Sequence, residues 1–433
     1  MRDLDMIQSS IDYIEENLRA EISAQELAER ANYSLFHYYR LFQTAVGMPV
    51  MQYILRRRLL HAIYEIGCGN TMMDTVMSYG FDTYAGFYKA FKREFGYTPR
   101  QFLERFRCIR PYRICLEGED HIMITHKKLR EILKNWNMEN ETITDIIYEN
   151  GEKNDCAYYV GDDHVVKFYV NLGEAKVQID ISRALEQLGF SVATPVGAAN
   201  GQEIIEDGQL YYVLTQRLIG ERLKAANLYD GDYKAKARFV GEIVGRLNLA
   251  LKKVNVVVND VNIYDDVINW ALPRVKEIMD IPEDLCIAIV EEFGAIYPGL
   301  PRQIIHRDSN PSNIIVSGDK WGFIDFDLSE KNVRIYDPCY AATAVLSEDY
   351  VENNEEKLLR WIAIYKNIIN GYDRVTGLSK EEKKAIPFVI LCNQFICTAW
   401  FYERREKYEN LYDANWKMTQ WICRNFDKLT IQE

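Results

Sequence analysis

Three oxygen-bearing side chains lie close together within residues 304–327. Asp308 follows a short apolar run that is typical of a β-strand, and Asn313 lies five residues further on. A turn at residues 317–319 precedes a second strand, which ends at Asp325. Because a hairpin folds its second strand back along the first, we expect Asp325 to lie beside the loop that holds Asp308 and Asn313.

Phosphoryl transfer from a nucleotide requires this set of side chains. One unprotonated carboxylate orients the attacking hydroxyl, while an amide oxygen and a second carboxylate hold the Mg²⁺ ions that neutralise the β- and γ-phosphates. Asp308 fits the first role, and Asn313 and Asp325 fit the second. A plain turn also favours Asp, Asn, Ser and Pro, but the spacing between two apolar strands favours the catalytic interpretation.

The motif HRDSNPSN followed by IDFD resembles the catalytic loop and metal aspartate of the aminoglycoside phosphotransferase, choline kinase and homoserine kinase superfamily. These enzymes are small-molecule relatives of protein kinases. The resemblance implies that Asp308 is the catalytic base, that Asn313 and Asp325 are metal ligands, and that His306 is a structural residue of the loop.

The surrounding residues agree with the family in part. Arg307 stands where many members carry Gly, and Asp337-Pro338 resembles the Asp-Pro turn that follows the metal strand. Ala341 stands where a further Asp is usual.

Residues 142–170 are predicted to form three short strands separated by two turns, because β-branched and aromatic residues are enriched in this segment. Lys167 on the third strand has the position of the lysine that holds the α- and β-phosphates in the kinase-like family. An unpaired lysine is costly to bury in an apolar strand, which favours a functional role. A turn that covers the triphosphate with its backbone amides would include Gly151 and Asn154.

Two further segments belong to the expected nucleotide site. In the family the lysine pairs with a glutamate on the next helix, where this sequence has Gln178, and Glu174 lies one turn earlier on the same face. After a buried strand, Gln216 and Leu218 fall in a stretch that resembles the hinge that binds the adenine. The expected cofactors are therefore ATP or GTP, together with Mg²⁺.

The first hundred residues carry two helix-turn-helix patterns. Ser23 and Glu26 form a capping box before a short helix, and Ser34 can cap a second helix whose apolar residues recur at helical spacing. The pattern returns after Gly80, where Thr83 can cap a similar helix. A long helix over residues 50–66 links the two units, so one chain could read two successive major grooves.

These two units and their linking helix resemble the AraC/XylS family of bacterial transcription regulators. The family implies that the outward-facing residues of each second helix contact bases or phosphates of double-stranded DNA. The predicted contacts are Phe36, His37, Tyr39, Arg40 and Gln43 in the first unit and Tyr84, Ala85, Tyr88, Lys89 and Lys92 in the second.

The predicted fold is multidomain. An all-α double helix-turn-helix domain occupies residues 1–107, and a linker over residues 108–142 contains an amphipathic helix that is either a spacer or a cap on the next domain. An α+β protein-kinase-like domain occupies residues 143–433. Its small N-lobe sheet would end near residue 217, and its C-lobe would be largely helical.

Composition and charge limit the partners. Residues 1–107 hold 13 Lys and Arg against 13 Asp and Glu, so the net charge of −12 falls on the rest of the chain, which suits a cationic small-molecule acceptor. The nine cysteines lack the spacing of a zinc site or a disulfide framework. With neither a signal peptide nor an apolar run of membrane length, we expect a cytoplasmic protein without a membrane partner.

Three functions stay open on the sequence. The first is a DNA-binding transcription regulator fused to an active small-molecule phosphotransferase, with an aminoglycoside among the candidate acceptors. In the second, the kinase-like domain binds its ligand without turnover and acts as a sensor, as Gln178 suggests. In the third, the protein is a phosphotransferase whose helical domain only makes protein contacts.

Overall fold

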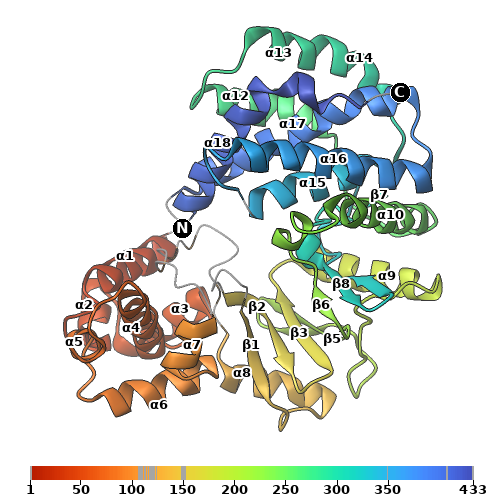
Figure 1. The fold of residues 1–433 in the computed structure, drawn as a ribbon. Coiled ribbons are helices and arrows are strands. Elements are labelled where there is room, and N and C mark those ends of the chain that lie inside the picture. Colours follow the sequence, from red (N-terminus) through yellow and green to blue (C-terminus); the bar gives the residue numbers. More distant parts are fainter. Residues whose placement is uncertain are drawn as a thin grey trace. The chain divides into compact units, whose positions relative to one another are not determined.

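The computed structural model describes residues 2–105, 111, 114, 116, 122, 124–147, 153–348, 350–405 and 408–431. These residues form two compact units, drawn as a ribbon in Figure 1. The first contains Met1–Leu172 and Val196–Arg217, and the second contains Gly173–Pro195 and Leu218–Glu433.

The first unit begins with a helical domain that has the predicted double helix-turn-helix arrangement. Tyr38, Phe42, Phe87 and Phe91 are fully buried in one core cluster, as the helical periodicity predicts. The helices are α1 (Arg2–Glu16), α2 (Ala24–Arg30), α3 (Leu35–Val46), α4 (Val50–Gly67), α5 (Met72–Ser78), α6 (Tyr84–Phe95) and α7 (Pro99–Arg105).

The second helix of each helix-turn-helix unit is built in the same way. Ser34 caps α3 by accepting from the His37 amide at 3.4 Å, and Thr83 caps α6 by accepting from the Gly86 amide at 3.1 Å. Both helices end in a left-handed glycine, with φ of 83° after α3 and 75° after α6. Half of the predicted capping box at α2 is present, because Ser23 Oγ accepts from the Glu26 amide at 3.1 Å. The Glu26 carboxylate accepts from the Tyr13 hydroxyl at 2.6 Å.

The linking helix α4 turns its arginines inward. Arg56 and Arg57 are 3% and 2% exposed, so neither can be a surface contact for a polyanion. Arg57 forms an ion pair with Glu15 of α1 at 2.6 Å, and Arg56 lies 3.5 Å from Glu94 of α6. Arg58 donates to the Leu18 carbonyl at 2.8 Å. The arginines of α4 therefore hold α1, the turn that follows it, and α6 against the linking helix.

The buried pair of Glu15 and Arg57 predicts a pH-dependent stability. Burial alone would raise the pKa of Glu15, but bonds from His61, Arg57 and Tyr53 outweigh it and lower the pKa to about 2. The stabilisation is therefore present above the ordinary carboxyl pKa of 4.5 and is lost as the pH falls from there toward 2. We expect Glu15→Gln to destabilise the helical domain by about 3 kcal/mol at neutral pH, because Arg57 loses its buried counter-charge.

This expectation is measured by urea denaturation of the full chain, with hydrogen exchange of peptides from α1 and α4 as the readout. Glu16→Gln is the matched control, since Glu16 is the exposed neighbour on the same helix. The Glu15 variant should also lack the part of the acid destabilisation that the wild type shows between pH 4.5 and 2. An identical acid profile for wild type and Glu15→Gln would contradict the assignment.

The rest of the first unit is a five-stranded antiparallel sheet in the order β1-β2-β3-β5-β4. Helix α8 (His126–Leu133), predicted within the linker, packs its Leu129, Ile132 and Leu133 into the core of this sheet. The helix is thus a cap on the sheet. The strands are β1 (Ile143–Ile147), β2 (Lys153–Val160), β3 (His164–Tyr169), β4 (Ile205–Asp207) and β5 (Leu210–Gln216).

The second unit is mainly helical, around one large core. Helices α10 and α16 lie side by side in Figure 1, and their backbones approach closely at glycines. A Cβ at Gly241 would lie 1.9 Å from the Ile368 carbonyl oxygen, and one at Gly371 would lie 2.1 Å from that of Arg238. The helices are α9 (Leu172–Gln187), α10 (Tyr233–Leu251), α11 (Ile263–Asp266), α12 (Leu272–Lys276), α13 (Glu283–Ala288), α14 (Gly294–Ile296), α15 (Tyr336–Glu348), α16 (Glu355–Thr376), α17 (Lys380–Glu403) and α18 (Glu409–Arg424).

Two small sheets hold the loops of the second unit. One pairs β7 with β10, and the other has the order β6-β8-β9, in which β8 and β9 form the predicted hairpin. The strands are β6 (Glu221–Arg222), β7 (Arg302–Ile305), β8 (Ile314–Ser317), β9 (Lys320–Phe323) and β10 (Glu330–Val333).

Helix α17 is long and apolar enough to span a membrane by length and composition. However, 72% of its most apolar window is buried inside the structure, as in the core helix of a globular domain. The described cysteines form no disulfide bond.

Candidate active site

A buried carboxylate holds the loop that follows β7. Asp337, at the start of α15, is fully buried and accepts from the backbone amides of His306 and Arg307, each at 2.9 Å. The side chain of Asn248 on α10 donates to the same carboxylate at 2.6 Å. Two consecutive amides therefore point at one anion, which fixes the backbone immediately before Asp308.

The β8-β9 hairpin brings Asp325 to this loop. Ile314 pairs with Phe323 across the hairpin, and beyond the strands the Ile324 amide donates to the Asn313 carbonyl at 3.1 Å. The buried His306 ring lies 3.0 Å from the Ile324 carbonyl oxygen through Nε2. His306 thus links the loop that holds Asp308 to the residue immediately before Asp325.

Asp308 and Asn313 contact each other directly. Asn313 Nδ2 donates to the Asp308 carboxylate at 2.8 Å and to its carbonyl oxygen at 3.0 Å. Burial raises the pKa of Asp308, and the negative charge of Asp325 raises it further, while His306, Tyr340 and Asn313 oppose the rise. The two carboxylates are therefore close enough to sense each other's charge.

The donor atoms suit a hard divalent cation. Because Asn313 uses its Nδ2 on Asp308, its oxygen remains as the atom available to a ligand. Mg²⁺ prefers oxygen ligands, and it commonly takes one or two from the protein and the others from water and phosphate. Asn313 and Asp325 offer that number. Among the described residues, no group of three or more His, Cys, Asp and Glu side chains forms an all-protein metal site.

Two residues of the site have left-handed backbone conformations. Arg307 has a φ of 69° and Asp325 has a φ of 65°. Asp adopts this region more readily than most residues, whereas a long side chain does so at a cost of about 1–2 kcal/mol. The Arg307 guanidinium lies 2.9 Å from the carboxylate of Glu330 on β10, so this side chain is held in place.

Gln178 on α9 has a role that the sequence alone did not predict. It is 3% exposed, its side-chain oxygen accepts from the Phe326 amide at 2.7 Å, and its nitrogen donates to Ser182 at 3.0 Å. The side chain therefore holds the residue that follows Asp325. Glu174 lies one turn earlier on α9, as predicted.

The predicted nucleotide-binding residues of the first unit lie on the sheet or at its end. Lys167 is on β3, where it pairs with Ala157 and Val213, and its Nζ lies 5.2 Å from the centre of the Tyr169 ring. Gln216 ends β5. The boundary between the two compact units falls just before Leu218, within the stretch predicted as the hinge.

The predicted phosphate-covering turn differs from expectation at one residue. Asn154 lies within β2, where its side chain accepts from the Cys156 and Ala157 amides at 2.9 Å each. Asn is more common in turns than in strands, which is why the sequence suggested a turn at this position. Gly151 lies outside the described residues.

The predicted DNA-contacting residues lie on the outer faces of α3 and α6. Phe36 is 80% exposed, which is unusual for a large apolar side chain in a helical domain. The other exposed members are Arg40, Gln43, Ala85, Lys89 and Lys92, and the half-buried ones are His37, Tyr39, Tyr84 and Tyr88.

Several residues of the site were missed or only partly recognised from the sequence. Asp337 was noted for its Asp-Pro turn, but its contacts to the loop amides were not predicted. Asn248 and Tyr340 left no signal, because each is one polar residue within an otherwise apolar helical pattern. Gln178 was identified by position alone.

The comparison with protein families agrees with this geometry. Residues 147–378 match the model of the phosphotransferase enzyme family. Because this match covers more than half of the chain, the chain belongs to the phosphotransferase enzyme family. Residues 27–105 match a helix-turn-helix domain model.

The helical domain has curated relatives among transcription regulators. It is 35% identical over 95 residues to the HTH-type transcriptional activator AarP of Providencia stuartii, covering 22% of this chain and 70% of AarP. It is 30% identical over 101 residues to the regulatory protein SoxS of Salmonella typhimurium, covering 23% of this chain and 94% of SoxS. With the HTH-type transcriptional regulator YbfP of Bacillus subtilis it shares 33% identity over 104 residues, 23% of this chain, but the chain spans only 35% of YbfP.

Solved structures resemble the remainder of the chain. The amicoumacin kinase hAmiN, in complex with AMP-PNP, Ca2+ and Ami, superposes with a TM-score of 0.51 at 16% identity and covers 70% of this chain and 94% of its own. The GDP and kanamycin complex of APH(2")-IIia has a TM-score of 0.53 at 14% identity, with 70% and 99% covered. These likenesses show the kinase-like fold. The protein thus joins an AraC-type helix-turn-helix domain to a phosphotransferase-family domain.

The contacts of Asp337 predict a large effect of a small change. Asp337→Asn would put an amide where two backbone N–H groups and Asn248 require an acceptor, so we expect a loss of about 2–4 kcal/mol in the stability of the loop. Hydrogen exchange of the His306 and Arg307 amides in the full chain measures this. Asp280→Asn, on an exposed residue, is the control. Unchanged protection of both amides in the Asp337 variant would contradict the assignment.

Proposed function

We propose that the phosphotransferase-family domain transfers the γ-phosphate of ATP or GTP to a hydroxyl of a small molecule, and that Asp308 is the base. The observation that carries the proposal is the contact between Asp308 and Asn313 at 2.8 Å, with Asp325 near enough to raise the pKa of Asp308. One acceptor-facing carboxylate beside two oxygen donors for a cation is the minimal arrangement for this reaction.

In this proposal Asp308 accepts a hydrogen bond from the acceptor hydroxyl and orients its oxygen toward the γ-phosphorus. As the new O–P bond forms and the bond to the β-phosphate oxygen breaks, the hydroxyl proton passes to the Asp308 carboxylate. Asn313 and Asp325 would hold Mg²⁺, which neutralises the charge on the phosphates. His306 and Asp337 are positioning residues, because they hold the loop and touch no reacting atom.

The sheet of the first unit would supply the remaining nucleotide contacts. We assign the α- and β-phosphates to Lys167, for which Glu174 is the candidate partner, and we assign the cover over the phosphates to Gly151 and the first residues of β2, among them Asn154. Gln216 and Leu218 would contribute backbone groups to the base. These assignments rest on the family resemblance and on the positions of the residues in β3, α9 and β5.

The acceptor is expected to be a small amino alcohol or aminoglycoside in the cytoplasm. The net charge of −12 falls on the residues after the helical domain and attracts a cation, which supports this class of acceptor.

Asp308→Asn tests the catalytic proposal. The variant keeps the shape of the side chain but removes the base, so transfer of labelled phosphate from ATP or GTP should fall by about 100-fold or more. The assay uses a panel of aminoglycosides, choline-like amines and hydroxy amino acids. Asp280→Asn should retain full activity because Asp280 is exposed and outside the site. Equal rates for wild type and Asp308→Asn would sink the proposal.

A second candidate is a ligand sensor without turnover. It is favoured by Gln178, which stands where the family has a glutamate and spends both polar atoms on Ser182 and Phe326. In that case the wild type would bind nucleotide and acceptor but would neither transfer phosphate nor hydrolyse nucleotide.

We further propose that the outer faces of α3 and α6 read DNA as a pair. Two helices of matched construction, each capped by Ser34 or Thr83, present Phe36, Arg40 and Lys89 outward. Because α4 turns Arg56 and Arg57 inward, these two arginines are not available for phosphate contacts, which supports assigning such contacts to the outer faces of α3 and α6.

The double variant Arg40→Ala with Lys89→Ala tests the DNA contacts. If each cation neutralises one phosphate, the slope of log K against log salt concentration should become shallower by about 2. Binding is measured on the promoter region upstream of the gene by fluorescence anisotropy at several salt concentrations. Lys127→Ala, an exposed cation of α8, should leave the slope unchanged. A wild-type slope in the double variant would assign the DNA contacts elsewhere.

A further inference from the structure

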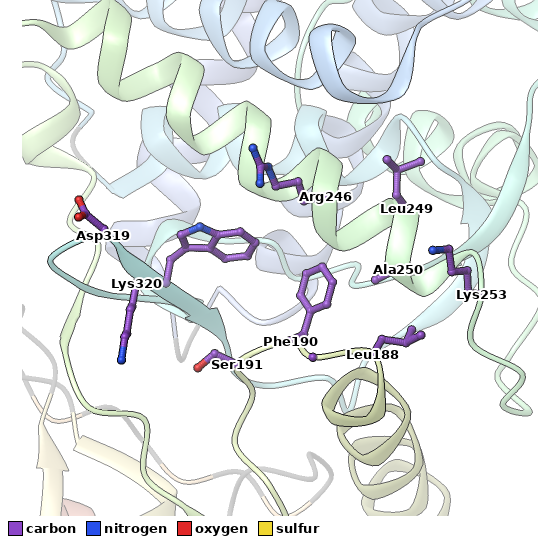
Figure 2. A pocket seen from close by; sticks show the side chains of 11 residues that line it. Leu188, Phe190, Ser191, Arg246, Leu249, Ala250, Lys253, Asp319 and Lys320 are labelled. Carbon is purple, nitrogen blue, oxygen red and sulfur yellow. The ribbon is translucent and has the colours of Figure 1, made fainter.

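A groove of about 540 Å³ lies in the second unit, apart from the loop of Asp308. Three segments line it: the turn after α9, the C-terminal half of α10 with the turn that follows it, and the tip of the β8-β9 hairpin, as Figure 2 shows. The lining residues are Leu188, Gly189, Phe190, Ser191, Arg246, Leu249, Ala250, Lys253, Asp319, Lys320 and Trp321. This volume is within the range of pockets that bind small molecules.

The floor of the groove is aromatic and apolar. Phe190 and Trp321 meet edge to face, with ring centroids 5.9 Å apart and an interplanar angle of 72°. Leu188 and Leu249 are 43% and 38% exposed at its sides, so the groove presents apolar surface to solvent. A flat ring placed here would gain contact with both aromatic side chains and cover these leucines.

The wall that α10 forms is cationic. Arg246 lies on α10 and Lys253 lies in the turn that follows the helix, and the two side chains are on either side of Phe190 in Figure 2. Neither side chain forms an ion pair with any described residue, although most other arginines of the second unit do. Lys320 points away from Phe190. Two uncompensated cations beside an aromatic floor stand out in a chain with a net charge of −12.

We propose that this groove binds a small aromatic anion, consisting of one or two fused rings that carry a carboxylate or a phosphate. The rings would lie against Phe190 and Trp321, and the anionic group would lie between Arg246 and Lys253. The indole N–H of Trp321 has no hydrogen-bond partner among the described residues, so it is available to a polar atom of the ligand.

The groove is connected to the strand that leads to the active site. Trp321 lies on β9, four residues before Asp325. The Ser191 carbonyl, in the turn that lines the groove, accepts from the Phe323 amide of the same strand at 3.2 Å. A ligand in the groove would therefore touch both segments that this hydrogen bond joins, namely the turn after α9 and strand β9.

Ligand-observed NMR titrations of the full chain test this proposal, with 2-naphthoate and 2-naphthyl phosphate as probes. We expect saturable binding of at least one of the two, and the tighter probe identifies the anionic group. The neutral 2-naphthamide and the non-aromatic hexanoate should bind at least about tenfold more weakly, since each lacks one half of the recognised chemistry.

Charge reversal locates the site. Arg246→Glu and Lys253→Glu should each weaken binding of the better probe by about tenfold, and neither side chain is buried or paired, so the fold is retained. Lys252→Glu makes the same charge change at the next residue, which does not line the groove, and should have no effect.

Three outcomes would overturn the proposal. The first is equal binding of 2-naphthoate and 2-naphthamide, because no anion would then be recognised. The second is an equal effect of Lys252→Glu and Lys253→Glu, which would indicate a general charge effect. The third is displacement of the probe by AMP-PNP with Mg²⁺, which would assign it to the nucleotide site.

Discussion

The second unit depends on one buried anion. Asp337 has no access to solvent, and its carboxylate is stable there only because two consecutive backbone amides and Asn248 donate to it. The bonds oblige the chain to turn at His306 and Arg307, and that turn sends Asp308 toward Asn313. The geometry of the loop is therefore set by a residue about thirty positions later in the sequence, at the start of a helix that itself belongs to the large core.

The sequence predicted those features of the fold that depend on residues close together in the chain. Local residue types explain the helix caps at Ser34 and Thr83, the helical spacing of buried residues along α3 and α6, and the hairpin between β8 and β9. The approach of Asp325 to Asp308 and Asn313 was predictable for the same reason, because the β8-β9 hairpin lies between Asn313 and Asp325 and brings its two ends together. The family match then shows that this local order belongs to a phosphotransferase fold.

Contacts between distant segments were not predictable. Three examples are the pairing of β7 with β10, the hydrogen bond from Phe326 to Gln178, and the burial of Arg56 and Arg57. In each case the residue types nearby in the sequence do not indicate which distant residue is the partner. An arginine triplet on a helix is usually a solvated surface, and only the positions of Glu15 and Glu94 reverse that expectation. Asn154 was expected in the turn before β2 because Asn is typical of turns, but it lies within the strand.

Arg307 has a consequence for the charge around the base. A glycine at position 307 would adopt the left-handed backbone conformation without cost. The backbone conformation therefore does not explain the arginine, and the reason lies in its side chain. The guanidinium neutralises Glu330 and lies near Asp266 and Asp308, which are acidic. With glycine at this position, the buried carboxylate of Glu330 would lose its guanidinium partner. In this protein the guanidinium partly offsets the negative charge that Glu330, Asp266 and Asp308 place around the loop.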